Sequence, residues 1–305
     1  MRRKSWKYDI SLLPTLSPTS LGHRHLLHRC DTSALWRHID PIQYNTSGDP
    51  ATHALSAMRK GSAEAKVLFD AEPDEGLFLR YLQAYDRCIS KVAESKKKPE
   101  LVALNKFWLT ELPVCDHLTL QQLSNVCKFK LTRGKMRPLQ KLVDSNDAEK
   151  VRASSHRAIA LLRQSTPDWE GALNALAELK GVGVATASCV TAAIRPDLAP
   201  FMSDEALEAA TPGGERDYSM KSYSLLRMSL VRKASALGRL NPAACWTAED
   251  VGRALWSCAM CSAHGVDVNG AGEGDLKELF KKTERKRKKT ASDTNSDDCS
   301  PRNKY

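Results

Sequence analysis

The chain has 305 residues, of which 42% are hydrophobic and 27% charged, as in an ordinary globular protein. No apolar run reaches the roughly 18 residues that a membrane-spanning helix needs, so we expect a soluble protein without a membrane partner. The nine cysteines are scattered and odd in number, which favours free thiols in a reducing compartment over a disulfide framework.

The net charge of +10 lies mostly outside the middle of the chain. Residues 1–30 contribute +5 and residues 281–289 contribute +6, while residues 273–280 contribute −2 and residues 290–305 contribute −1. Only +2 therefore falls on residues 31–272. Basic ends can steer a chain toward polyanions, but they say little about a specific site.

Three regions are expected. Residues 1–50 mix Pro, Ser, His and Gly without a sustained period and predict a mostly disordered basic leader. Residues 51–268 have helical patterns, and residues 269–305 form a basic, then Ser/Asp-rich tail that cannot bury a core. The string KKTERKRKK at 281–289 is typical of a nuclear import signal, so we expect import machinery as a partner and the nucleus as the location. The Arg-rich, acid-poor start keeps the mitochondrion as an alternative, and the cytoplasm is another.

Helix start and stop signals without strand-like alternation predict an all-α fold. Asp74 or Pro73 begins a helix that continues through residue 94, and a second helix begins at 98–100 and ends before Pro113. Thr119 is expected to cap a helix that stops at Gly134. The remaining helices are expected at 145–163, from Pro167 after a Thr166 cap, and at about 184–194, 203–210, 219–237 and 247–264.

The segment LKGVGVATA, residues 179–187, predicts a helix-hairpin-helix turn within residues 169–194. Glycine at 181 and at 183 permits positive φ and lets backbone approach a ligand without a Cβ. The second helix begins at once, so its unpaired N–H groups and positive dipole end face outward. Such a turn is a phosphate site built from backbone. The alternative is a glycine-capped helix end followed by an ordinary buried helix.

The hairpin and the string APFMSDEAL that follows it resemble the helix-hairpin-helix DNA glycosylase superfamily. Its hairpin reads Leu-Pro-Gly-Val/Ile-Gly-x-x-Thr-Ala, and a catalytic Asp follows about 20 residues later; here Asp204 stands 21 residues after Gly183. The local string is most similar to the 3-methyladenine branch, in which Phe precedes the Asp by three positions, as Phe201 does here. The resemblance is specific over residues 173–207. The segment FKLTRGKMRP, residues 129–138, is also similar to a WKLxRGKxRP-like segment of an uncharacterised eukaryotic group, which implies no activity.

The resemblance implies a monofunctional DNA glycosylase-like enzyme that binds double-stranded DNA and cleaves the N-glycosidic bond of a flipped base. Asp204 would stabilise positive charge on the deoxyribose or orient water, and Phe201 would border the base pocket. Val184 and Ala185 stand where bifunctional relatives have a Schiff-base lysine, so no lyase step is implied. No cofactor is expected, except for a possible monovalent cation at the hairpin. The alternative for Asp204 is helix capping, by Ser203 or Asp204 itself.

A basic cluster at residues 128–141 holds six Lys and Arg and no acid. Contacts to phosphates or a flanking strand are one interpretation, and a solvated turn at a helix C-terminus, where cations are favourable anyway, is the other. The expected DNA-backbone contacts are Gly181, Val182, Gly183, Val184, Ala185, Thr186, Arg133, Lys135 and Arg137.

No metal site is expected. Cys258, Cys261 and His264 lie on an apolar helix, where buried cysteine is common, and the cysteine spacing of iron–sulfur glycosylases is absent. Further aromatic candidates for a pocket wall are Phe107, Trp108, Trp169 and Trp256. Two functions remain open: a monofunctional glycosylase, or a catalytically inactive protein that keeps the hairpin for nucleic-acid binding or as a scaffold.

Overall fold

The computed structural model describes residues 50–268. This part of the chain is all-α, without a strand, as the sequence predicts. The expected leader, the tail and the candidate import signal at 281–289 lie outside the described residues. The helices are α1 (Pro50–Asp70), α2 (Glu75–Gln83), α3 (Tyr85–Ser95), α4 (Glu100–Thr110), α5 (Leu120–Arg133), α6 (Gln140–Asp144), α7 (Ala148–Arg163), α8 (Trp169–Ala177), α9 (Val184–Ile194), α10 (Asp204–Ala210), α11 (Met220–Leu240) and α12 (Ala248–His264), with short 3₁₀ turns at η2 (Leu112–Val114) and η3 (Pro212–Gly214).

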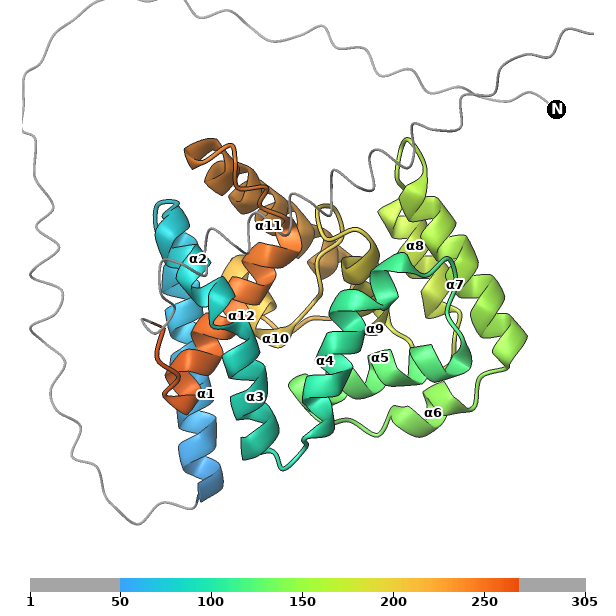
Figure 1. Ribbon diagram of the computed structural model, residues 1–305, viewed down its shortest axis with the longest axis horizontal. Coiled ribbons are helices and arrows are strands. Elements are labelled where there is room, and N and C mark those ends of the chain that lie inside the picture. Colours follow the sequence, from blue (N-terminus) through green and yellow to red (C-terminus); the bar gives the residue numbers. More distant parts are fainter. Residues whose placement is uncertain (1–49, 269–305) are drawn as a thin grey trace, which may run out of the picture. The chain divides into compact units, whose positions relative to one another are not determined.

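The helices form two groups that lie side by side in Figure 1. In one group α12 packs against α1, α2, α3, α10 and α11, and in the other α5 packs against α4, α6, α7 and α9. α1 approaches α12 so closely that a Cβ at Gly61 would overlap the carbonyl oxygen of Ala259. One apolar core runs through both groups, with Trp108, Phe129 and Trp256 among its largest fully buried side chains.

Local capping explains most helix starts. Thr119 caps α5 and Thr247 caps α12, each in a capping box in which the side chains of the cap and of the third helical residue satisfy backbone N–H groups reciprocally. α5 ends at Gly134, as expected. The expectation for α8 was wrong: Asp168 caps it by accepting a hydrogen bond from Gly171 N–H, and the helix begins at Trp169, after Pro167. The reason is that an Asp carboxylate is at least as good a cap as a threonine hydroxyl.

Two other features differ from the sequence expectation. The helix expected from residue 73 or 74 to residue 94 is divided at Ala84 into α2 and α3. The 21-residue α1 was not singled out, because its mean hydropathy is low and glycine stands in its middle. It forms because packing against α12 and α10 supplies the stabilisation that helix propensity alone does not.

Candidate functional site

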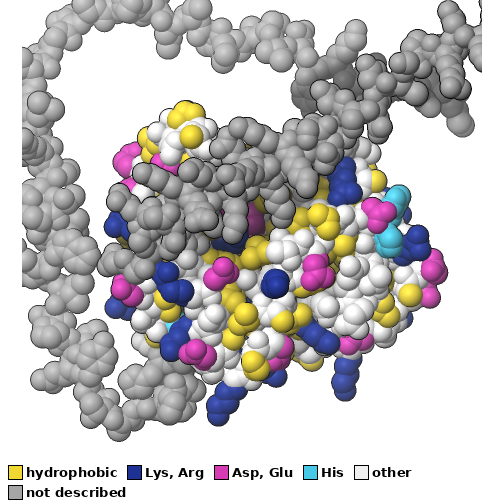
Figure 2. Space-filling model, in the orientation of Figure 1, with side chains coloured by type: hydrophobic (Ala, Val, Ile, Leu, Met, Phe, Trp, Pro, Cys, Tyr) yellow, Lys and Arg dark blue, Asp and Glu magenta, His cyan; other side chains and the backbone are white. Residues whose placement is uncertain are grey.

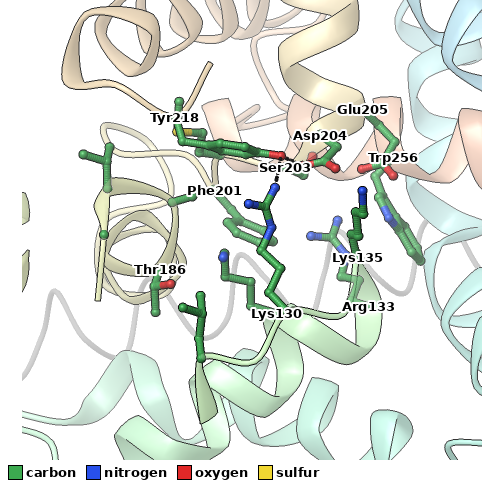
Figure 3. A pocket seen from close by; sticks show the side chains of 17 residues that line it. Lys130, Arg133, Lys135, Thr186, Phe201, Ser203, Asp204, Glu205, Tyr218 and Trp256 are labelled. Carbon is green, nitrogen blue, oxygen red and sulfur yellow. Dashed lines mark hydrogen bonds between the residues drawn. The ribbon is translucent and has the colours of Figure 1, made fainter. Parts of the chain in front are cut away.

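A pocket of about 190 Å³ lies where the two helix groups meet (Figure 3). Its lining comes from the C-terminal end of α5 and the turn after it, the N-terminus of α9, the segment that leads into α10, and one aromatic residue each from the α10–α11 connection and α12. The volume is below the roughly 300–1,000 Å³ of sites for drug-sized molecules, so it suits one compact group. The lining residues are Lys130, Arg133, Gly134, Lys135, Arg137, Leu139, Gly183, Val184, Ala185, Thr186, Phe201, Met202, Ser203, Asp204, Glu205, Tyr218 and Trp256.

The two glycines of the hairpin have different structural roles. Gly181 has φ +75°, and an added Cβ would meet Val143 Cγ2 at 2.9 Å and Leu142 Cβ at 3.1 Å, so folding itself requires glycine there. Gly183 is extended, with φ −97°, and a Cβ there would meet nothing within 4 Å. The expectation of positive φ at both glycines was therefore wrong at Gly183, whose missing side chain leaves open space beside the pocket.

Asn146, in the turn between α6 and α7, holds the hairpin. Its Oδ1 accepts a hydrogen bond from Lys180 N–H at 2.8 Å, and its Nδ2 donates to Lys180 carbonyl at 2.9 Å and to Val143 carbonyl at 2.8 Å. A buried amide that makes these bonds fixes the position of the turn relative to α6. The sequence pattern gave no sign of this contact, since 34 residues separate the partners.

The N-terminus of α9 opens on the pocket. Gly183 is its N-cap and offers no side chain to the first N–H groups. The N–H of Val182 donates to Leu179 carbonyl and that of Thr186 to Gly183 carbonyl. The N–H groups of Gly183, Val184 and Ala185 are thus the ones left to meet an anion at this helix end. Val182 has its side chain in the core, and neither it nor Gly181 lines the pocket.

Asp204 faces the pocket because hydrogen bonds to backbone N–H groups fix the two residues at 201 and 202 that precede it. Glu249 Oε2 accepts a hydrogen bond from Phe201 N–H at 2.7 Å, and Ser188 Oγ of α9 accepts one from Met202 N–H at 2.9 Å. Ser203 then caps α10 by accepting from Ala206 N–H. Of the two capping alternatives, Ser203 is the cap, and the Asp204 side chain is left to face the pocket.

Both carboxylate oxygens of Asp204 are hydrogen-bonded. The Tyr218 hydroxyl donates to Oδ1 at 2.7 Å (Figure 3). Arg216 Nη1 donates to Oδ2 at 3.0 Å. Arg216 also forms an ion pair with Glu208 at 2.5 Å. Burial and the hydrogen bond to Asp204 raise the pKa of Tyr218 to about 12, so its hydroxyl remains a donor at neutral pH. The Asp204 side chain is 18% exposed, which leaves it accessible from the pocket mouth.

Glu205 is a second carboxyl in the lining and was not a sequence candidate. The residue is 6% exposed, and burial, followed by the negative charge of Asp204, raises the pKa of its carboxyl. Arg133 and Arg216 act in the opposite direction on that pKa. The sequence shows that Glu205 follows Asp204 directly. Only the tertiary structure shows that the Glu205 carboxyl is buried in the same pocket.

Arg133 lies in an aromatic cage rather than in an exposed basic patch. Its guanidinium carbon is 4.3 Å from the Trp256 ring centroid and 5.0 Å from that of Phe201, and the rings of Tyr85 and Phe129 are at 5.6 and 6.0 Å. Arg133 is 4% exposed, and its Nε and Nη1 have no hydrogen-bond partner among the described residues. The expected surface contact with phosphate therefore does not fit Arg133, because the last turn of α5 points this side chain toward α12.

The rest of the basic cluster does border the pocket. Lys135 and Arg137 are exposed, and Arg137 Nη2 donates to the Tyr218 hydroxyl at 3.2 Å while its guanidinium carbon lies 4.9 Å from the Tyr218 ring centroid. Lys130 is half-buried in the lining, and burial lowers the pKa of its amine. Lys96 Nζ donates to the last carbonyls of α5, at Thr132, Arg133 and Gly134, and so stabilises the helix end that carries this cluster.

One face of the described residues has both signs of charge. On the face shown in Figure 2, Lys and Arg side chains are interspersed with Asp and Glu side chains. That face is therefore not broadly basic, whereas Lys130, Arg133, Lys135 and Arg137 gather at the pocket. This mixture of charges agrees with the net charge of only +2 on residues 31–272.

Of the aromatic candidates, Phe201 and Trp256 line the pocket, and Phe107, Trp108 and Trp169 do not. Cys258 and Cys261 are buried on α12, and Cys261 Sγ lies 3.4 Å from Cys88 Sγ. Within residues 50–268, no group of three or more His, Cys, Asp or Glu is placed to hold a metal ion. In the same range no helix is long and apolar enough to cross a membrane.

Comparisons of the chain with protein-family models, with curated proteins and with solved structures find no match. Function is therefore inferred from the geometry of the pocket and from the resemblance of residues 173–207.

Proposed function

We propose that the chain is a helix-hairpin-helix DNA-binding protein with a monofunctional DNA glycosylase-like activity, directed at the N-glycosidic bond of a flipped base. The observation that carries the proposal is that Asp204 and the N-terminus of α9 line the same small pocket. A helix N-terminus suits a phosphate, and a carboxylate beside it suits the sugar attached to that phosphate. Asp204 and the N-terminus of α9, which come from separate segments of the sequence, thus share one pocket.

In this mechanism the N–H groups of Gly183, Val184 and Ala185, with Lys135 and Arg137 at the rim, hold the phosphates of double-stranded DNA. The nucleotide must leave the stack because its glycosidic bond is inaccessible inside the duplex. As the C1′–N bond breaks, its electron pair leaves with the base and positive charge develops on the sugar. The Asp204 carboxylate, which Arg216 and Tyr218 hold in place by hydrogen bonds, stabilises that charge. Water then adds to C1′ and loses a proton.

No lyase step is part of the proposal. Val184 and Ala185, at the start of α9, hold the positions of a Schiff-base lysine in bifunctional relatives and carry no amine. Lys180, on the other side of the hairpin, is exposed and does not line the pocket. The proposal includes no cofactor. Whether a monovalent cation binds at the hairpin turn can be tested by substituting one salt for another.

The test is single-turnover base excision on a panel of lesion-containing duplexes, comparing wild type with Asp204→Asn. We expect excision of at least one base by wild type and a loss of about 10²-fold or more in Asp204→Asn, as for removal of one stabilising group at a charged transition state. Excision that survives the substitution would remove Asp204 from the mechanism.

The second candidate is an inactive nucleic-acid-binding or scaffold protein. It is favoured by the occupation of both Asp204 oxygens by Tyr218 and Arg216. Absence of excision on every lesion, with DNA binding retained, would support it. Deleting residues 281–305 separates the tail from the pocket in the binding assay. If all salt-dependent binding disappears with the tail, the hairpin is not an independent DNA site.

A further inference from the structure

Glu205 differs from its neighbour Asp204 in what surrounds its carboxyl. Asp204 has a hydrogen bond on each oxygen, from Tyr218 and from Arg216. Among the described residues, no other side chain donates a hydrogen bond to the Glu205 carboxyl or forms an ion pair with it, and its one hydrogen bond comes from its own backbone. One pocket therefore holds a fully bonded carboxylate and a carboxyl that is free to exchange a proton.

The two carboxyls also lie at different depths. Asp204, with 18% of its side chain exposed, lies beside Tyr218, whereas Glu205, 6% exposed, lies beside Trp256 (Figure 3). A nucleotide held by its phosphates at the N-terminus of α9 would keep its sugar near the mouth. Its base would then extend into the pocket toward Glu205, with the Arg133 guanidinium between the base and the rings of Phe201 and Trp256. This order places Asp204 beside C1′ and Glu205 beside the base.

Burial and the charged groups around Glu205 explain why its carboxyl holds a proton to a higher pH than an ordinary glutamate. Burial and the charge of Asp204 raise the pKa of Glu205. Arg133 of α5 and Arg216, in the connection after α10, lower it, and Lys96 is a further cation in its field. A buried carboxyl whose surroundings raise its pKa is suited to act as an acid in an active site.

We propose that Glu205 is the general acid of the site, donating its proton to a ring nitrogen of the departing base. The proposal rests on the glycosylase function of the same pocket. The C1′–N bond breaks, its electron pair passes to the base, and the proton of Glu205 neutralises the charge that the base would otherwise carry away. Water adds to C1′ and releases one proton, which restores Glu205 directly or through solvent. The net reaction is hydrolysis, with no other reactant.

The test compares two kinds of leaving base in single-turnover excision from duplex DNA. Hypoxanthine and uracil are neutral bases that would leave as anions unless protonated, whereas 7-methylguanine is already cationic and leaves as a neutral molecule. We expect Glu205→Gln to lower excision of the neutral bases by about 10²–10⁴-fold, the usual contribution of general acid catalysis, and to leave excision of 7-methylguanine unchanged. Asp204→Asn should lower both.

A pH profile adds a readout that a merely structural role would not change. Wild-type excision of a neutral base should fall as pH rises through the pKa of Glu205, and Glu205→Gln should lose that dependence. Glu205→Asp keeps a proton and should restore part of the rate. Glu208→Gln removes one negative charge from the same helix, outside the pocket lining, and should leave the ratio between neutral and cationic bases as in wild type.

The outcomes separate this inference from the function on which it rests. If wild type excises bases and Glu205→Gln lowers neutral and cationic bases equally, Glu205 is not the acid, while the glycosylase function stands. If wild type excises none of the bases, the function fails and the role of Glu205 in it fails too. In the DNA-free protein, carbon NMR of labelled glutamate should show one carboxyl, absent from Glu205→Gln, that titrates above the ordinary Glu range. Titration at or below that range would overturn the proposal.

Discussion

The Tyr218 hydroxyl donates a hydrogen bond to Asp204 Oδ1 at 2.7 Å, and the Tyr218 ring contacts the guanidinium of Arg137. One side chain thus links the carboxylate in the pocket to the basic residue at its rim. The hydroxyl contacts both Asp204 and Arg137 Nη2, whereas the ring contacts only Arg137. Removing the oxygen alone therefore frees Asp204 and leaves Arg137 its contact with the ring.

Tyr218→Phe should lower base excision by about tenfold and leave DNA affinity near the wild-type value. The variant loses a hydrogen bond to a charged group, a loss in the range of about 1.5–3 kcal/mol, part of which is recovered by water at this half-buried position. Arg137 loses its 3.2 Å hydrogen bond to the hydroxyl, but this exposed side chain can bond water instead and keeps its contact with the ring. Single-turnover excision and a DNA titration measure the two quantities. Equal losses in both would show that the hydroxyl acts on binding rather than on Asp204.

Substitution of the two hairpin glycines should separate folding from DNA binding. Gly181→Ala places a side chain at φ +75° and against Val143 and Leu142, so we expect a loss of about 1–3 kcal/mol in the free energy of unfolding. Gly183→Ala meets no neighbour and should change stability by at most about 1 kcal/mol, the usual difference at an N-cap. The same alanine lies where a phosphate would approach α9, so DNA affinity should fall.

Denaturant unfolding and a duplex-binding titration give both quantities for the glycine variants. A Gly183→Ala protein that is stable and binds DNA as wild type does would contradict the phosphate site at α9. Asn146→Ala provides a comparison, because it loosens the turn from α6 without adding an atom to the pocket.

Removal of the exposed charges at the rim should weaken DNA binding in a salt-dependent way. Lys135→Ala and Arg137→Ala should each lower affinity at low salt and reduce the slope of log K against log salt by about 1, as expected for loss of one phosphate contact. Lys106→Ala is a matched control, since Lys106 is exposed on α4 and does not line the pocket. An unchanged slope for Lys135→Ala and Arg137→Ala would place the DNA elsewhere.

Glu249 should make the protein less stable as pH rises. Burial raises the pKa of its carboxyl above 4.5 in the folded protein, so between 4.5 and the folded pKa the folded state binds more protons than the unfolded state. Stability from this group is complete below 4.5 and is lost as pH rises through the folded value. Glu249→Gln has no such titration.

The free energy of unfolding of Glu249→Gln relative to wild type should therefore increase from pH 4.5 to pH 8 in denaturant melts. The introduced glutamine keeps a side-chain oxygen to accept the hydrogen bond from Phe201 N–H. A relative stability that decreases with pH over this range would mean that Arg253 and Arg133 hold the carboxylate ionised in the folded state.

Much of the local structure follows from the sequence because it depends on contacts within a few residues. The caps at Thr119 and Thr247, the end of α5 at Gly134 and the start of α10 at residues 203–204 all use hydrogen bonds between positions three or four apart. The hairpin at 179–187 and the distance from Gly183 to Asp204 are likewise properties of one short segment. These features predict an all-α fold, and the resemblance of residues 173–207 to the glycosylase superfamily is what made Asp204 a candidate.

The composition of the site was decided by packing between distant segments. Arg133, a charged residue expected at the surface, is buried because α5 meets α12 across the rings of Phe201 and Trp256. Tyr218 reaches Asp204 through the fold of the connection after α10, and the carboxyl of Glu205 is buried where α10 packs against α1 and α12. The burial of a polar side chain depends on its neighbours in space and not on its own residue type. The sequence therefore determined the helices and the hairpin, and tertiary packing determined which charges share the pocket.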